Sequence, residues 1–226
     1  MANDSESIPL IQSMEQTLKI EHLSLVRDIG EVFLDCVFEE GVLKELPIIG
    51  TIVGTTKCIK NINDILFTKK LLAFLKGICD VDSHDRQVAV EKWESESRYR
   101  VNVGETLLAM IHRCDDSQKA VWLSKLFYEL VLLRQKSALF MRAEKVLSSL
   151  SVMDVVSFLS YKESSVEELS LEEGEPYSSS GLYRIKPPKE EVMVEVFYFK
   201  STKYLITEVG KWIYFILNDK VSKMQI

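Results

Sequence analysis

The stretch from Gly41 to Ile78 limits the possible folds of this chain more than any other, because it is both the most apolar and the most basic part of the sequence. Pro47 is tolerated at the first turn of a helix, since the N–H that proline lacks would have no intrahelical partner there. A helix that starts near Leu46 places Gly50 and Gly54 four residues apart on one face. Small residues at that spacing let a second backbone approach closely. The stretch therefore predicts a close helix crossing.

A second helix is expected after a break at Asn61 and Asn63, with lysines at the margins of an apolar pattern. The apolar residues of this helix are Ile65, Leu66, Leu72, Phe74, Leu75 and Ile78. The candidate residues for interaction or close helix packing are Pro47, Ile48, Ile49, Gly50, Ile52, Gly54, Lys57, Lys69 and Lys70, with Trp122 and Phe127 as later aromatic anchors.

The charge of residues 41–78 leaves two interpretations open. This stretch carries +4 in a chain of net charge −6, so the other residues carry −10. The two helices could lie in a membrane interface, with the apolar face toward the acyl chains and the ammonium groups toward anionic lipid headgroups. They could equally form a hairpin buried by the rest of the chain, with the lysine side chains reaching water. No window reaches the roughly 18 to 20 apolar residues of a spanning helix, so a single membrane span is not expected.

The rest of the amino-terminal part has helical periodicity. Residues 1–18 are polar and predict a flexible arm or a short helix, and residues 19–136 predict a helical bundle. One amphipathic helix is expected from Glu21 to Glu39. Asp116 or Ser117 is expected to cap the second of two strongly periodic helices farther along.

The carboxy-terminal part, residues 137–226, contains the convincing strand signals. Gly181–Ile185 and Val192–Phe199 are rich in β-branched and aromatic residues on either side of two prolines, which predicts a β-hairpin. Thr207 is expected to cap a last helix. Before the hairpin, residues 162–176 contain six glutamates against one lysine, and this composition predicts a solvated acidic loop.

The order of helices, hairpin and helix in residues 137–226 resembles a winged helix-turn-helix domain, and Tyr204 to Gly210 is similar to the strand-to-helix exit of such domains. The segment in the position of the recognition helix, Ser164 to Gly174, carries carboxylates where DNA phosphates would lie. Each such like-charge contact would cost on the order of 1 kcal/mol. An acidic chain also lacks the excess of Lys and Arg that phosphate binding uses. We therefore expect a winged domain that makes protein contacts, and nucleic acid is disfavoured as a partner.

A second resemblance covers roughly residues 40–130. The pattern ELPIIGTIVG, followed by LFTKKLLAFLKGI and RVNVGETLLAMIHRCDDSQKAVWLSKLF, is similar to a recurrent arrangement in uncharacterised bacterial proteins. The resemblance implies a helical protein of the bacterial cytoplasm. It carries no functional residue over to this chain.

Catalytic and metal-binding residue types do not form recognisable motifs. The four cysteines are scattered singly, which predicts free thiols in a reducing cytosol. No Gly-rich phosphate loop precedes a helix, and no Ser or Cys stands in a nucleophile elbow. Asp80, Asp82, His84 and Asp85 lack the glycine and the distal glutamate of a calcium loop, and Asp82 or Ser83 is expected to cap a helix instead. We expect no catalytic, cofactor-binding or metal-ligating residue.

The whole sequence predicts a mainly α fold, in which an α-helical bundle is followed by a small α+β, winged-helix-like unit with a β-hairpin. The function expected first is a non-catalytic bacterial interaction or regulatory protein of the cytoplasm, acting through contacts with a protein partner or through self-association. Two alternatives remain open. One is a membrane-acting toxin or defence effector that uses residues 41–78 at the inner membrane. The other is a DNA-binding transcriptional regulator.

Overall fold

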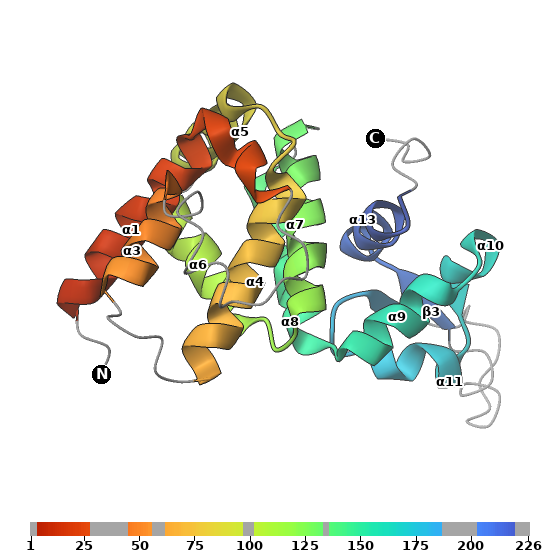
Figure 1. The fold of residues 1–226 in the computed structure, drawn as a ribbon. Coiled ribbons are helices and arrows are strands. Elements are labelled where there is room, and N and C mark those ends of the chain that lie inside the picture. Colours follow the sequence, from red (N-terminus) through yellow and green to blue (C-terminus); the bar gives the residue numbers. More distant parts are fainter. Residues whose placement is uncertain are drawn as a thin grey trace, which may run out of the picture. The chain divides into compact units, whose positions relative to one another are not determined.

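The computed structural model describes residues 4–27, 45–55, 62–96, 102–132, 136–186 and 203–219. The predicted fold class is confirmed: the protein is mainly α, with a small α+β part that contains an antiparallel sheet near the C-terminus (Figure 1). The chain divides into two compact units, Met1–Ser137 and Ala138–Ile226, which we call the N-terminal unit and the C-terminal unit.

The N-terminal unit is a bundle of helices in which α4 packs along α7, while α1 packs against α3, α5 and α6 (Figure 1). Its described elements are α1 (Asp4–Lys19), the 3₁₀ helix η1 (Glu21–Val26), α3 (Pro47–Thr55), α4 (Ile62–Ile78), α5 (Ser83–Glu96), α6 (Val103–Arg113) and α7 (Ser117–Leu132).

The contact between α4 and α7 forms the centre of this unit. The rings of Phe74 and Phe127 are tilted against each other with centroids 5.7 Å apart, and both side chains are buried. Near the end of α4 the two backbones approach closely, because a Cβ atom at Gly77 would lie 1.8 Å from the hydroxyl oxygen of Ser124. A glycine on one helix and a small hydroxyl residue on the other therefore set the distance of this crossing.

The predicted helix starts at Asp82 and Asp116 are confirmed. The Asp82 side chain accepts a hydrogen bond from the backbone N–H of His84 at 2.8 Å, and α5 begins at the next residue, Ser83. The Asp116 side chain accepts one from the N–H of Gln118 at 2.6 Å, at the start of α7. These carboxylates satisfy backbone donors that have no partner inside the helix, so local capping explains them.

The first 27 residues differ in detail from the sequence-based expectation. Residues 4–19 form α1, whose Met14 and Leu18 are fully buried. Of the helix expected from Glu21 to Glu39, residues 21–26 form the 3₁₀ helix η1, and the remainder lies largely outside the described residues. The backbone of His22 departs from helical geometry, with φ −92° and ψ 30°, which interrupts a regular helix there.

Arg86 in α5 joins three chain segments of the N-terminal unit. Its side chain is 1% exposed. Its Nε donates a hydrogen bond to the carbonyl of Leu18 at 2.8 Å, and its two terminal nitrogens donate to the carbonyls of Ile20 and Val81. Burial lowers the pKa of the guanidinium. One buried cation thus satisfies three carbonyl groups where α1 ends and where the α4–α5 turn lies.

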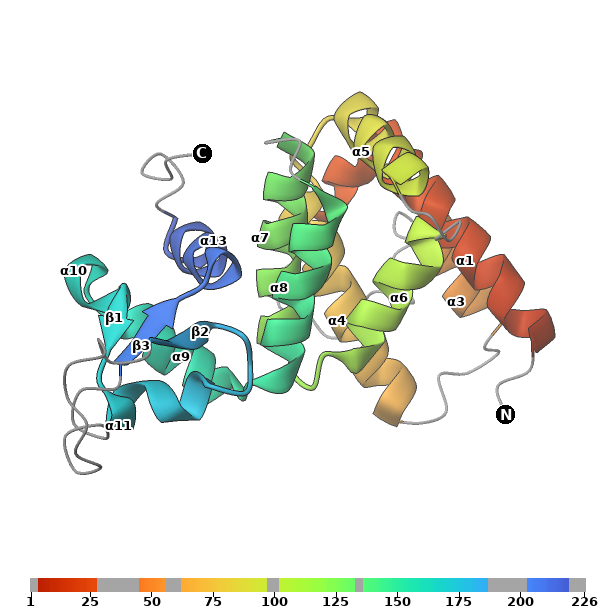
Figure 2. The same cartoon turned by 180° about the vertical axis from the view of Figure 1, so that it is seen from behind.

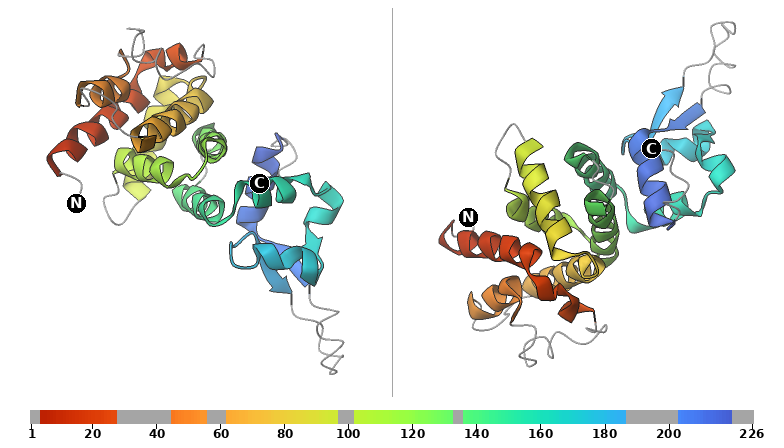
Figure 3. Two further views of the ribbon diagram at one scale, coloured as in Figure 1. Left: turned by 60° about the horizontal axis from the view of Figure 1, so that its bottom comes forward. Right: turned by 90° about the horizontal axis from the view of Figure 1, so that it is seen from above.

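The C-terminal unit combines short helices with a three-stranded antiparallel sheet in the order β1-β3-β2 (Figure 2). Two further views show its strands and the final helix α13 (Figure 3). Its described elements are α8 (Ser137–Ser149), α9 (Val152–Ser160), α10 (Glu163–Val166), β1 (Glu168–Leu169), α11 (Leu171–Gly174), the 3₁₀ helix η3 (Glu175–Tyr177), β2 (Tyr183–Lys186), β3 (Lys203–Ile206) and α13 (Glu208–Leu217).

The strands lie partly where the sequence predicts them. The segment Gly181–Ile185 overlaps β2, which pairs with β3 so that Tyr183 lies opposite Ile206. The other predicted strand, Val192–Phe199, lies outside the described residues. Residues 162–176, expected as an acidic loop, contain α10, β1, α11 and the start of η3, because capping and strand pairing give this segment local order.

Aromatic side chains fill the core of the C-terminal unit. The ring of Phe158 contacts those of Tyr177, Tyr183 and Tyr214, with centroids 5.7 to 6.0 Å apart. Two of the buried hydroxyl groups donate to backbone carbonyls: that of Tyr183 to Val166 at 2.8 Å and that of Tyr214 to Tyr161 at 2.6 Å. The aromatic rings thus supply apolar area, while the hydroxyls of Tyr183 and Tyr214 join β2 to α10 and α13 to the end of α9.

Candidate interaction surfaces

The apolar part of α3 lies in the core. Ile48 and Ile49 are fully buried and Ile52 is 8% exposed. The helix begins at Pro47, as the sequence predicts, and packs against α1. These side chains therefore stabilise the N-terminal unit and present little surface to a partner.

The polar contacts of the α1–α3 crossing come from hydroxyl residues. The Thr17 hydroxyl of α1 accepts a hydrogen bond from the backbone N–H of Ile48 at 3.1 Å, and the Ser13 hydroxyl of α1 bonds the Thr51 hydroxyl of α3. Gly50 is half-buried, whereas a Cβ at Gly54 would meet no atom within 4 Å. Gly54 is therefore not needed for a close approach to the described residues.

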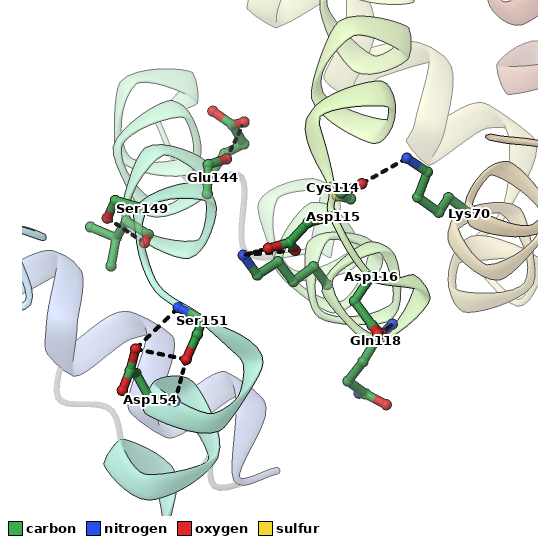
Figure 4. Close-up of polar contacts among 12 residues, drawn as sticks. Lys70, Cys114, Asp115, Asp116, Gln118, Glu144, Ser149, Ser151 and Asp154 are labelled. Atoms are coloured by element: carbon green, nitrogen blue, oxygen red, sulfur yellow. Dashed lines mark hydrogen bonds and ion pairs between the residues drawn. The ribbon is translucent and has the colours of Figure 1, made fainter. Parts of the chain in front are cut away.

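The candidate lysines have different environments. Lys70 donates a hydrogen bond to the carbonyl of Cys114 at 2.7 Å (Figure 4). It donates a second to the carbonyl of His112 at 3.1 Å, so its ammonium group satisfies carbonyls at the end of α6. Lys69, the next residue on α4, is exposed to solvent. Lys57 lies outside the described residues. Lys70 thus has a structural role, while Lys69 is available to a partner.

The aromatic anchors Trp122 and Phe127 both lie in α7 and are buried, with exposed fractions of 6% and 1%. Phe127 meets Phe74 of α4, as described above. Both side chains therefore belong to the packing of the bundle. Neither forms part of an exposed surface.

The acidic pair at the start of α7 is engaged locally. The ammonium group of Lys119, which is 2% exposed, forms an ion pair with Asp115 at 2.9 Å (Figure 4).

Two cysteines of the N-terminal unit, Cys79 and Cys114, are buried free thiols. Burial is the main cause that raises the pKa of the Cys79 thiol. Among the residues that the structure describes, no group of three His, Cys, Asp or Glu side chains is placed to hold a metal ion.

Acidic side chains of the C-terminal unit are partly neutralised by lysines. Glu167 of the α10–β1 junction pairs with Lys211 of α13 at 2.9 Å. Glu173 closes the start of α11 in a capping box with Ser170, so a carboxylate already occupies the position at which a helix start binds anions. Glu172 and Glu175 are exposed beside it.

The outward face of α9 is formed by Met153, Val156, Ser157 and Ser160, spaced three and four residues apart. Met153 is 70% exposed and Val156 is 46% exposed, whereas Val155 and Phe158 on the opposite side are buried. No charged residue lies on this face. Asp154, the one charged residue of α9, forms a capping box with Ser151 at the helix start (Figure 4).

Sequence reasoning missed this face, although a signal was present. Between Ser151 and Tyr161 a single charged residue occurs, so any amphipathic helix there must expose an uncharged side. A helix that faces water usually carries charges on its outer side. The lack of charged residues on the outer side of α9 is therefore the sequence pattern that indicates this face.

A hollow of about 430 Å³ lies in the C-terminal unit between α10 and α13. Val166, Ile206 and Phe215 contribute its apolar wall, and the Glu167–Lys211 ion pair is among its polar lining. The hollow is of a size that small ligands occupy. It offers one ion pair beside apolar surface, which does not specify a ligand class.

Comparisons with protein-family models, with curated proteins and with solved structures find no match for this chain. In the described parts of the chain, no helix combines the length and the apolar character that crossing a membrane requires.

Proposed function

We propose that this protein is a non-catalytic interaction or regulatory protein that acts through contacts with a protein partner or with a second copy of itself. The observation that carries the proposal is the uncharged outward face of α9, with Met153 70% and Val156 46% exposed. Single exposed apolar residues are common on protein surfaces. Two of them on one helical face that carries no charge are a feature of interaction sites.

The composition of the face supports a protein as the partner. The centres of protein interfaces are depleted of charged residues and enriched in methionine. Met153 and the lack of charged residues agree with this composition, and a helical face of this kind can lie in an apolar groove or against another helix. The resemblance of residues 40–130 to uncharacterised bacterial proteins is compatible with this role, and we propose that the protein acts in a bacterium.

The proposal is tested first by size-exclusion chromatography with light scattering over a range of protein concentrations. We expect the full chain to exceed the mass of one copy. The double variant Met153→Asp/Val156→Asp is expected to weaken association about tenfold or more, because it introduces charge into the buried centre of the interface. Met141→Asp is the matched control, since Met141 is an exposed methionine of α8, 41% accessible.

A partner other than a second copy is tested by a photoreactive side chain at position 153, with position 141 as the control, in a bacterial lysate. We expect specific adducts from position 153 that the Val156→Asp change removes. A strictly monomeric protein that gives the same adducts from both positions would contradict the proposal. Far-ultraviolet circular dichroism verifies that each variant is folded.

A further inference from the structure

We infer that the outward face of α4 docks on the surface of an anionic lipid bilayer. This face consists of Ile62, Leu66, Lys69, Ala73 and Lys76, spaced alternately four and three residues apart. The opposite side of the helix is buried in the N-terminal unit and consists of Thr68, Leu71, Phe74, Leu75 and Ile78. This face belongs to α4 of the N-terminal unit, whereas the proposed protein contact uses α9 of the C-terminal unit.

The exposed apolar side chains lie at the beginning of the helix. Ile62 is 69% exposed and Leu66 is 47% exposed, one turn apart on the same face. Lys69 and Lys76 follow on that face and are also exposed. The helix thus presents two branched apolar side chains followed by ammonium groups, which is the combination that interfacial helices use to enter the headgroup region.

The charged residues that α4 itself contributes to this face are the lysines Lys69 and Lys76. Asp64 is the one acidic residue of α4, and it is spaced four residues before the buried Thr68, on the inner side of the helix. Lys70 is turned toward the carbonyls at the end of α6. Asp115, which follows Cys114 in the chain, is paired with Lys119 of α7.

An anionic bilayer fits this face better than a protein does. Lysine is depleted from the centres of protein interfaces, yet two of the five residues on the face are lysines. A lysine close to an anionic membrane gains from the negative surface potential, while isoleucine and leucine gain by leaving water. Charge complementarity and apolar exposure therefore favour the same occupant.

Within the stretch 41–78, the exposed apolar residues that could contact a membrane are Ile62 and Leu66 of α4. Ile48, Ile49 and Ile52, the obvious candidates in the sequence, are buried against α1, so aspartate at these positions would disrupt the core. Ile62 and Leu66 can be changed without opening the core. They are the residues on which a docking test must rest.

The test is flotation of the full chain with phosphatidylcholine vesicles, with and without phosphatidylserine. We expect binding that requires phosphatidylserine and weakens at high salt. Ile62→Asp/Leu66→Asp is expected to lower the partition coefficient about tenfold or more, and Lys69→Gln about fivefold. Leu132→Asp, at an equally exposed leucine of α7 (46%), and Lys19→Gln, at an exposed lysine of α1, are the matched controls and should leave binding unchanged.

Absence of binding to the phosphatidylserine vesicles would overturn the inference. Equal binding by the Ile62→Asp/Leu66→Asp variant and the Leu132→Asp control would also overturn it. Loss of self-association in light scattering, with vesicle binding unchanged, would assign the face to a second copy instead. Because the proposed protein contact uses α9, failure of the vesicle test and failure of the Met153→Asp/Val156→Asp test are separate results.

Discussion

The side chain of Glu168 links the three described strands of the C-terminal unit. It lies in β1 and forms ion pairs with Lys186 of β2, at 2.9 Å, and with Lys203 of β3. The hydrogen bonds from these two lysines lower the pKa of the Glu168 carboxyl to about 2. Because the charged form is the one that is stabilised, the contribution is present above the ordinary carboxyl pKa and is lost as the pH falls toward about 2.

We predict that substitution of either lysine raises this pKa toward its ordinary range. In Lys203→Met the carboxyl loses one of its two partners, so its titration midpoint should rise, and the paired state should end at a higher pH. Carbon-detected NMR titration of Glu168 measures this directly. Lys145→Met, at an exposed lysine of α8, is the control. An unchanged midpoint in both Lys186→Met and Lys203→Met would show that the ion pairs do not exist in solution.

At the scale of single helices, two glycines are expected to respond in opposite directions to the same change. A Cβ at Gly77 would lie 1.8 Å from the Ser124 hydroxyl and 2.5 Å from its Cβ, so Gly77→Ala should destabilise the protein by about 1–3 kcal/mol through overpacking of α4 against α7. Gly54→Ala should stabilise α3 by up to about 1 kcal/mol, because a methyl group there meets no atom and alanine favours helix.

Urea unfolding of the two alanine variants measures both effects. The double variant Gly77→Ala/Ser124→Gly provides the control for the crossing, since it removes the atoms that the new methyl group would strike. Its free energy of unfolding should exceed that expected from adding the two single changes. Strict additivity would show that the two helices are not held together at this point.

The elements that could be predicted from the sequence are those whose signals are local. The periodicity around Leu107 and Leu123 and the caps at Asp116 and Thr207 depend on neighbours within a few residues, and the structure has helices there. Leu66 belongs to an apolar pattern of the same kind, yet it is exposed. Which side of α4 is covered depends on α7 and α6, which come later in the chain, and no local pattern contains that information.

The same limit applies to the candidate sites. The candidate interaction residues Ile48 and Trp122 are buried. Apolar character alone predicts a core residue and an interface residue equally, so the sequence could not separate the two. Arg86 stands among polar residues at the start of α5, so nothing local indicates that its guanidinium is buried against three carbonyls. The α9 face could have been found, because its signal, a lack of charge between Ser151 and Tyr161, is local.

At the scale of the whole molecule, we expect damage to one unit to remain in that unit. The hydrogen bonds of Arg86 to Leu18, Ile20 and Val81 lie within the N-terminal unit, and a Cβ at Gly174 would lie 2.3 Å from the Tyr204 ring within the C-terminal unit. Arg86→Met should cost about 3 kcal/mol, because it leaves buried carbonyls without a donor. Gly174→Ala should cost about 1–3 kcal/mol through overpacking.

Hydrogen exchange followed by mass spectrometry resolves the two units peptide by peptide. Arg86→Met should speed exchange in α1 and α5, and Gly174→Ala in α11 and the sheet. Arg142→Met, at an exposed arginine of α8, is the control and should change the free energy of unfolding of neither unit by more than about 0.5 kcal/mol. Equal acceleration in both units by Arg86→Met would show that the chain unfolds as a single cooperative body.

The hydrogen bond from the Ile48 N–H to the Thr17 hydroxyl has a consequence for the order in which the chain folds. A helix of nine residues is marginal by itself, because nucleation is costly. The second residue of α3 obtains its hydrogen-bond acceptor from the last turn of α1, so α3 is completed when α1 docks. Thr17 of α1 therefore supplies the hydrogen-bond acceptor at the start of α3, and the two helices should form and melt together.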